Sequence, residues 1–121
     1  MKRLPRLAAL LAKVATGDPA ALPAADVLRA ATLGGAQALG LDADLGSLGP
    51  GKFADVVAVD LGTLEAAPCY DPVSHLVHVV GREAVTDVWV AGQRLVADRV
   101  LTTVDEAALF ARARLWQERL Q

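Results

Sequence analysis

Apolar side chains recur every three or four residues near the start of the chain, which is the spacing of one face of an α-helix. This pattern predicts a helix over residues 6–16. Gly17, followed by an aspartate and a proline, predicts the end of that helix, because glycine readily adopts the left-handed conformation of helix C-termini. The apolar stripe of the helix consists of Leu4, Leu7, Leu11 and Val14.

A second helix is predicted to begin near Pro23, since the fixed φ of proline suits the first turn of a helix. The pair Gly34-Gly35 predicts a break after this helix, and Thr32 is expected to cap a short third helix. Gly40 predicts the end of the third helix. The apolar face of the second helix includes Val27, Leu28 and Ala31.

Strand patterns follow in the middle of the chain. The stretch from Gly46 to Asp60 opens with glycines and a proline, which are typical of a tight turn, and closes with β-branched residues that predict a buried strand over 55–60. Apolar residues alternate again over 85–90, which predicts a second strand. Ala91-Gly92 predicts a two-residue turn that returns the chain as a hairpin partner over 93–97.

Two short patterns predict further helices. The apolar run 75–80 is interpreted as a short helix that ends at Gly81. Thr103 and Glu106 match a capping box, which predicts Thr103 as the N-cap of a C-terminal helix. The stripe of that helix, which is expected to pack against another part of the protein, consists of Leu109, Ala113, Trp116 and Leu120.

Composition narrows the classes of function. A chain of 121 residues suffices for one domain, and 14 acidic against 12 basic residues give a net charge of −2. This balance predicts neither a nucleic-acid partner nor an anionic membrane surface. The single cysteine, Cys69, has no partner for an internal disulfide, which favours a reducing, cytoplasmic location. The apolar run 7–12 is too short for a typical signal peptide because Lys13 interrupts it.

The loop Gly46–Lys52 fits the first seven positions of a phosphate-binding loop. Phe53 stands where the magnesium-binding hydroxyl belongs, and Pro50 removes a backbone N–H of the phosphate cradle. A strand rather than a helix follows the loop, so the helix N-terminus that would bind an anion is missing. The pattern therefore predicts a structural turn and not a nucleotide site.

A second candidate site combines Cys69, Asp71, His75 and His78, all of which carry possible transition-metal ligands. The two histidines are three residues apart and would share a helix face. The spacing fits no standard zinc motif, and a lone cysteine is often a small core residue. A binding module that uses this cluster remains one hypothesis for the chain, beside a purely structural interpretation.

Three stretches of the chain together resemble the C-terminal end of the amidohydrolase superfamily, namely ATLGGAQALG, GSLGPGKFADVVAVD and VTDVWVAGQRLV. They are most similar to its TRZ/ATZ-type branch, which includes methylthioadenosine/S-adenosylhomocysteine deaminases. The resemblance implies a structural turn between two strands, in which Asp55 bonds nearby backbone. Lys52 is expected to lie at the surface and to contribute little to stability. The residues that carry this turn motif are Gly46, Gly51, Lys52, Ala54 and Asp55.

The resemblance implies an α+β fold in three parts. Residues 1–40 would be the terminal helices of a (β/α)8 barrel, 41–104 the C-terminal portion of a small composite β-sandwich, and 105–121 a closing helix. The parent function would be that of a metal-dependent amidohydrolase that hydrolyses C–N bonds of an amino-heterocycle such as an adenosine derivative. The rival hypothesis is a non-catalytic assembly piece that completes a partner chain carrying the barrel.

The same resemblance implies zinc or another divalent metal in the parent enzyme, held by a His-x-His pair, two later histidines and an aspartate. None of these ligands is identified in this sequence, whose only histidines are His75 and His78. No catalytic or metal residue is therefore predicted here, no cofactor is expected in this chain, and the chain alone is expected to be inactive. Without barrel strands the helices of residues 1–40 would leave apolar side chains exposed, so self-association or a barrel-carrying partner is expected.

Overall fold

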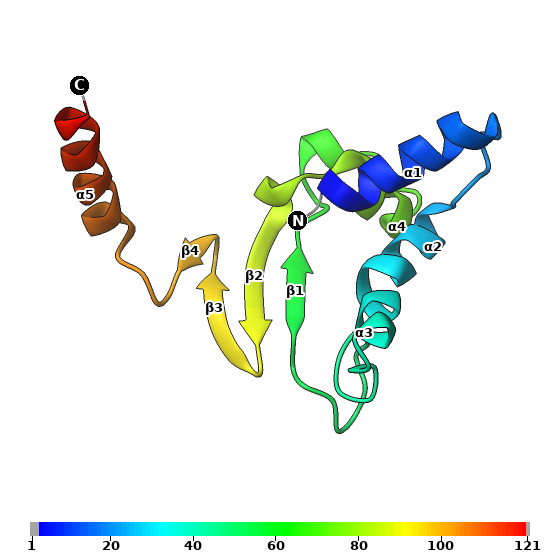
Figure 1. Cartoon of the computed structure of the whole chain (residues 1–121), viewed down its shortest axis with the longest axis horizontal. Helices are drawn as coiled ribbons and strands as arrows, with labels where there is room; N and C mark the ends of the chain where they lie inside the picture. Colours follow the sequence, from blue (N-terminus) through cyan, green and yellow to red (C-terminus); the bar gives the residue numbers. More distant parts are fainter. Residues whose placement is uncertain (1–2, 121) are drawn as a thin grey trace.

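The computed structural model describes residues 3–120 and combines short helices with one antiparallel sheet (Figure 1). The helices are α1 (Arg3–Thr16), α2 (Ala24–Arg29), α3 (Gly35–Ala38), α4 (Pro72–Ser74) and α5 (Glu106–Arg119). The strands are β1 (Val56–Val59), β2 (Val85–Val90), β3 (Gln93–Ala97) and β4 (Val100–Leu101).

A small helical layer contains the buried core. Ala9 of α1 is fully buried against Val27 of α2 and Val77 of the π-helical turn His75–Val79, with Leu22 and Ala24 packed around them. Figure 1 shows α1 crossing beside α2 and α4. The apolar side chains of residues 1–40 were expected to lack partners, but Val27 has them in Ala9 of α1 and Val77 of the turn after α4. The core is built largely from small side chains, which lets the helices approach closely.

The leucine stripe of α1 does not face this core. Leu4, Leu7 and Leu11 are between 50% and 67% exposed, and Val14 is 81% exposed. The expected exposure of this stripe is therefore confirmed. Helix α1 uses its alanine face for packing and presents its larger apolar side chains outward, which leaves an apolar surface available.

Two of the predicted glycine stops, Gly17 and Gly40, are confirmed. Helix α1 ends at Thr16 and is followed by Gly17 with φ +67°, while Gly40, with φ +68°, follows the end of α3. The Lys13 ammonium group donates hydrogen bonds to the carbonyl oxygens of Pro19 and Ala21, at 2.7 and 2.8 Å. These bonds fix the loop that leads from α1 into α2.

The predicted helix break at Gly34-Gly35 was wrong. Helix α2 continues through a π-helical turn, Ala30–Gly34, directly into α3, and Gly34 has helical angles of φ −62° and ψ −39°. Thr32 is not an N-cap, because its hydroxyl donates back to the carbonyl of Leu28 at 2.8 Å. Such a bond within the helix satisfies the hydroxyl without ending the helix.

The sheet has the order β1-β2-β3-β4, and every neighbouring pair is antiparallel. The predicted strands 85–90 and 93–97 coincide with β2 and β3, whereas β1 is shorter than the predicted 55–60. The expectation that this strand is buried was wrong, because Val57 is 54% exposed. Ala91 and Gly92 have φ of +48° and +79°, as a type I′ hairpin turn requires, so the predicted turn is confirmed. The short strand β4 was not predicted, and two register shifts interrupt the ladders on either side of β2.

Helix α5 forms where it was predicted but differs in two respects. Its N-cap is Asp105, whose carboxylate accepts a hydrogen bond from the Ala108 amide at 3.0 Å, and not Thr103. No residue of α5 is buried, so the expected packing of its stripe was wrong for this chain by itself. Figure 1 shows α5 projecting beyond the sheet.

The mixture of helices with an antiparallel sheet makes this an α+β fold, as expected. The assignment of residues 1–40 to a barrel, 41–104 to a sandwich and 105–121 to a closing helix stays a prediction. Within residues 3–120, no helix has both the length and the apolar content needed to cross a membrane.

Candidate functional site

The loop between α3 and β1 carries the turn motif, and Gly46 attaches it to the helical layer. A Cβ atom added at Gly46 would lie 2.8 Å from both the Ala36 Cβ and the Leu33 Cα, closer than atoms can pack. Gly46 also has φ +82°, a conformation that other residues rarely adopt. Glycine is therefore required at this position for two independent reasons.

Lys52 ties the loop together and is not a simple surface lysine. Its side chain is half-buried, and its ammonium group donates hydrogen bonds to the carbonyl oxygens of Asp42 and Leu45. The Phe53 amide donates to the Asp44 carbonyl at 2.9 Å and closes the same loop. Lys52 was expected to lie at the surface, and the structure adds that the loop curls around its half-buried side chain.

Asp55 links this loop to the hairpin turn. Its carboxylate accepts a hydrogen bond of 2.7 Å from the Ala91 amide, and the Ala54 carbonyl accepts one of 3.1 Å from Gly92. Gly51 has the expected positive φ, +87°, but no atom lies within 4 Å of the Cβ it lacks. The motif therefore holds β1 against the β2–β3 turn, which is a structural role.

The most buried charge of the sheet is Asp87 of β2, which is 9% exposed. Arg94 of β3 pairs with its carboxylate through two N–H groups, and the Nε to Oδ1 distance is 3.0 Å. Arg94 also stacks over the Trp89 ring, 5.5 Å from its centre. The hydrogen bond from Arg94 is the largest influence that lowers the pKa of Asp87 below its usual value. Asp87 therefore remains charged at neutral pH and serves as a fixed anchor of the hairpin.

The pairing of Asp87 with Arg94 was not predicted from the sequence, although the sequence contains a signal for it. An acidic residue inside an apolar strand needs a partner when it is buried. The two-residue turn places Arg94 opposite Trp89, one diagonal step from Asp87. An arginine just beyond a predicted hairpin turn can thus be recognised from sequence as the cross-strand partner of a buried aspartate.

The Cys69–His78 cluster does not assemble into a site. Asp71 caps α4 by accepting the Val73 amide, and the His75 Nδ1 atom lies 3.0 Å from the Asp71 carbonyl oxygen. Cys69 is exposed and free. Among residues 3–120, no three histidine, cysteine or acidic side chains are arranged to hold a metal ion. The described residues therefore do not fit the metal that the resemblance implies for the parent enzyme.

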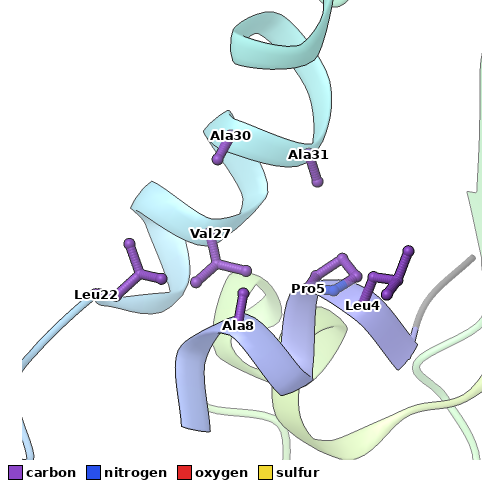
Figure 2. A pocket seen from close by; sticks show the side chains of 7 residues that line it. All are labelled: Leu4, Pro5, Ala8, Leu22, Val27, Ala30 and Ala31. Carbon is purple, nitrogen blue, oxygen red and sulfur yellow. The ribbon is translucent and has the colours of Figure 1, made fainter. Parts of the chain in front are cut away.

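An open apolar groove of about 290 Å³ lies between α1 and the α2 segment. Figure 2 shows the side chains that line it, which come from α1, from α2 and from the residues on either side of α2: Leu4, Pro5, Ala8, Leu22, Val27, Ala30 and Ala31. None of these side chains can donate a proton, attack a substrate or bind a metal. The groove is therefore suited to packing and not to chemistry.

Comparisons with known proteins identify the family of the chain. Residues 1–95 match the amidohydrolase family. A 5-methylthioadenosine/S-adenosylhomocysteine deaminase of Teredinibacter turnerae is 46% identical over 113 residues, which make up 93% of this chain and 26% of the relative. A 5'-deoxyadenosine deaminase of Methanosarcina acetivorans is 41% identical over 95% of this chain and 26% of its own length.

Solved structures of similar fold belong to related enzymes. A zinc-bound adenosine deaminase from Xanthomonas campestris superposes with a TM-score of 0.91 at 50% identity, over 98% of this chain and 27% of that protein. The zinc complex of atrazine chlorohydrolase TrzN from Arthrobacter aurescens superposes with a TM-score of 0.79 at 32% identity, over 92% of this chain and 25% of TrzN. The chain belongs to the amidohydrolase family, and it spans about a quarter of the length of these relatives.

Proposed function

We propose that this chain is the C-terminal portion of a metal-dependent amidohydrolase that deaminates an adenosine derivative. The observation that carries the proposal is the 46% identity to a deaminase over 93% of the chain. Similarity at this level along nearly the whole chain, together with a TM-score of 0.91 to an adenosine deaminase, supports a common architecture in that region. Adenosine derivatives are the substrate class because the names of several relatives specify them.

In this proposal the chain contributes structure rather than reacting groups. Its polar clusters are used in turns, caps and the Asp87–Arg94 pair, and its described residues offer no metal-binding group. The metal of the parent enzyme, zinc by analogy with the solved relatives, would activate the attacking water from a site on the remaining polypeptide. This chain would supply the apolar groove and the sheet against which that polypeptide packs.

The first experiment measures activity of the chain alone. The purified chain, supplied with zinc, should release no ammonia from 5'-methylthioadenosine, adenosine or 5'-deoxyadenosine, because a catalytic zinc needs about three protein ligands in the correct geometry. Metal-dependent ammonia release by the chain, abolished by a chelator and restored by zinc, would contradict this prediction.

The second experiment tests for complementation. The T. turnerae relative, lacking the segment that matches this chain, is produced in the same cells as the affinity-tagged chain. The relative's own matching segment, tagged in the same way, is the positive control. We expect the chain to co-purify with the truncated relative and to restore ammonia release. If only the positive control restores activity, the proposal of a deaminase component is wrong.

The exposed apolar stripe of α1 favours one rival, a non-catalytic assembly piece. The same experiment separates the two ideas. An assembly piece would co-purify with the barrel-carrying polypeptide without changing its ammonia release, whereas a missing portion of the enzyme would restore it.

A further inference from the structure

We propose that the leucine stripe of α1 and the apolar groove beside it form an interface between two copies of this chain. Leu4 belongs both to the stripe and to the lining of the groove, so the two features join into one apolar patch (Figure 2). The inference concerns the chain by itself and does not depend on the proposed deaminase function.

The patch is complementary to itself in shape, because a ridge and a hollow lie side by side. The stripe is the ridge, and its large side chains are between 50% and 81% exposed: Leu4, Leu7, Leu11 and Val14. The groove is the hollow, with a volume of about 290 Å³, and its lining includes the small side chains of Ala30 and Ala31. A two-fold axis brings the same patch of both copies together. The stripe of each copy can therefore enter the groove of the other.

The charges of α1 are compatible with such a symmetric pair. Arg6 and Lys13 each follow a leucine of the stripe by two positions, which is about 200° around a helix, so they lie on the other side of α1. All seven residues that line the groove are apolar. Like charges therefore do not meet where the two patches would face each other.

An anionic membrane surface fits this helix less well than a second copy does. Helices that lie on such membranes are rich in free cations on their polar face and often carry aromatic residues on the other. The Lys13 ammonium group is already bonded to the carbonyl oxygens of Pro19 and Ala21. Among the side chains of α1 that the structure describes, Arg6 alone is a cation without a bonded partner, and α1 has no aromatic residue.

The size of the patch indicates a reversible dimer. One helix face and one groove make a small interface, of the class that buries less than about 1,200 Å² in total and forms transient complexes. We therefore expect a Kd between about 1 and 100 μM. Sedimentation equilibrium of the purified chain from about 1 to 300 μM covers this range.

A charge in the stripe tests its half of the interface. Leu11→Glu places a carboxylate at the stripe, and Leu109→Glu of α5 is the matched control. The two leucines are 58% and 55% exposed, and both lie in helices of 14 residues. We expect Leu11→Glu to raise the Kd of the dimer by about tenfold or more, and Leu109→Glu to change it by less than about twofold.

A larger side chain in the groove tests the other half, and it remains informative if Leu11→Glu prevents folding. Ala31→Leu keeps the lining apolar and suits a helix, but it fills the groove from within. It should raise the Kd by about fivefold or more, because the stripe of the other copy loses its place. Ala107→Leu, which adds the same leucine to exposed helix α5, should leave the Kd within about twofold.

Three results would overturn the proposal. The first is a chain that stays monomeric up to about 300 μM, or that forms larger species without a defined dimer. The second is a dimer that Leu109→Glu dissociates and Leu11→Glu does not, because that result would place the interface on α5. The third is a dimer whose Kd is the same with Ala31→Leu as with Ala107→Leu, because the groove would then receive nothing. Binding of a monomeric chain to phosphatidylserine vesicles, abolished by Leu11→Glu, would identify a membrane as the occupant and likewise contradict our assignment.

Discussion

Helices α1 and α5 have the same length, 14 residues, yet only one of them takes part in a core. Ala9 of α1 is fully buried, whereas every described residue of α5 is exposed. Local signals are present at both helices: a glycine with positive φ follows α1, and a capping aspartate precedes α5. The comparison shows that local sequence determines where a helix forms, while a tertiary partner determines whether its apolar side chains are buried.

The substitution pair with the largest expected difference introduces a glutamate into the helical core and into α5. Val27 is 2% exposed and Leu115 is 57% exposed. Val27→Glu should lower the free energy of unfolding by about 3 kcal/mol or more, because a buried carboxylate has no partner in this core. Leu115→Glu should change it by less than about 0.5 kcal/mol. Urea denaturation followed by circular dichroism measures both values, and similar losses would show that α5 packs in solution.

A second test separates the effects of backbone conformation and packing where the turn motif meets the helical layer. Gly46 and Gly51 both have positive φ, but only Gly46 has atoms at 2.8 Å from the position of a Cβ. Gly51→Ala should cost about 1 kcal/mol, for the left-handed conformation alone. Gly46→Ala should cost about 2–3 kcal/mol, because the added methyl group also overlaps Ala36 and Leu33. Equal thermal midpoints for the two variants would contradict the close contact.

The smallest effect is expected at the start of α5. Asp105→Ala should destabilise this helix by about 1 kcal/mol, because the Ala108 amide loses its acceptor. Thr103→Ala, at the position predicted from sequence, should have almost no effect. Amide exchange of α5 is the measurement, and it should accelerate without a shift in the global unfolding midpoint. A larger effect of Thr103→Ala would restore Thr103 as the cap.

The sequence predicts those features that depend on local chemistry. Gly17 and Gly40 end helices because their φ is positive, and Ala91-Gly92 forms the expected turn. Features that depend on tertiary contacts were not predicted. Gly34 lies in a continuous helix although glycine usually weakens one, and Lys52 is enclosed by carbonyls that its own loop brings together. Gly46 packs against Leu33 and Ala36, a contact between loop and helix that no local pattern reveals.

The turn motif was recognised from sequence, but its role required the structure. Asp55 was expected to bond nearby backbone, and its partner, the Ala91 amide, is 36 residues away along the chain. Arg94 was not considered, because its role depends on the hairpin register that places it beside Asp87. A motif indicates that a residue matters, whereas the strand register shows which group it contacts.

The bond between Asp55 and Ala91 also has a consequence for the order of folding. Strands β2 and β3 are joined by two residues, and hairpins of this kind form within about 1–10 μs. Strand β1 joins them by closing a much longer loop, whose entropic cost grows with its length. We expect the hairpin to form first and the Ala91 amide to receive Asp55 as β1 docks. Strand β1 is thus among the last parts of the sheet to be completed.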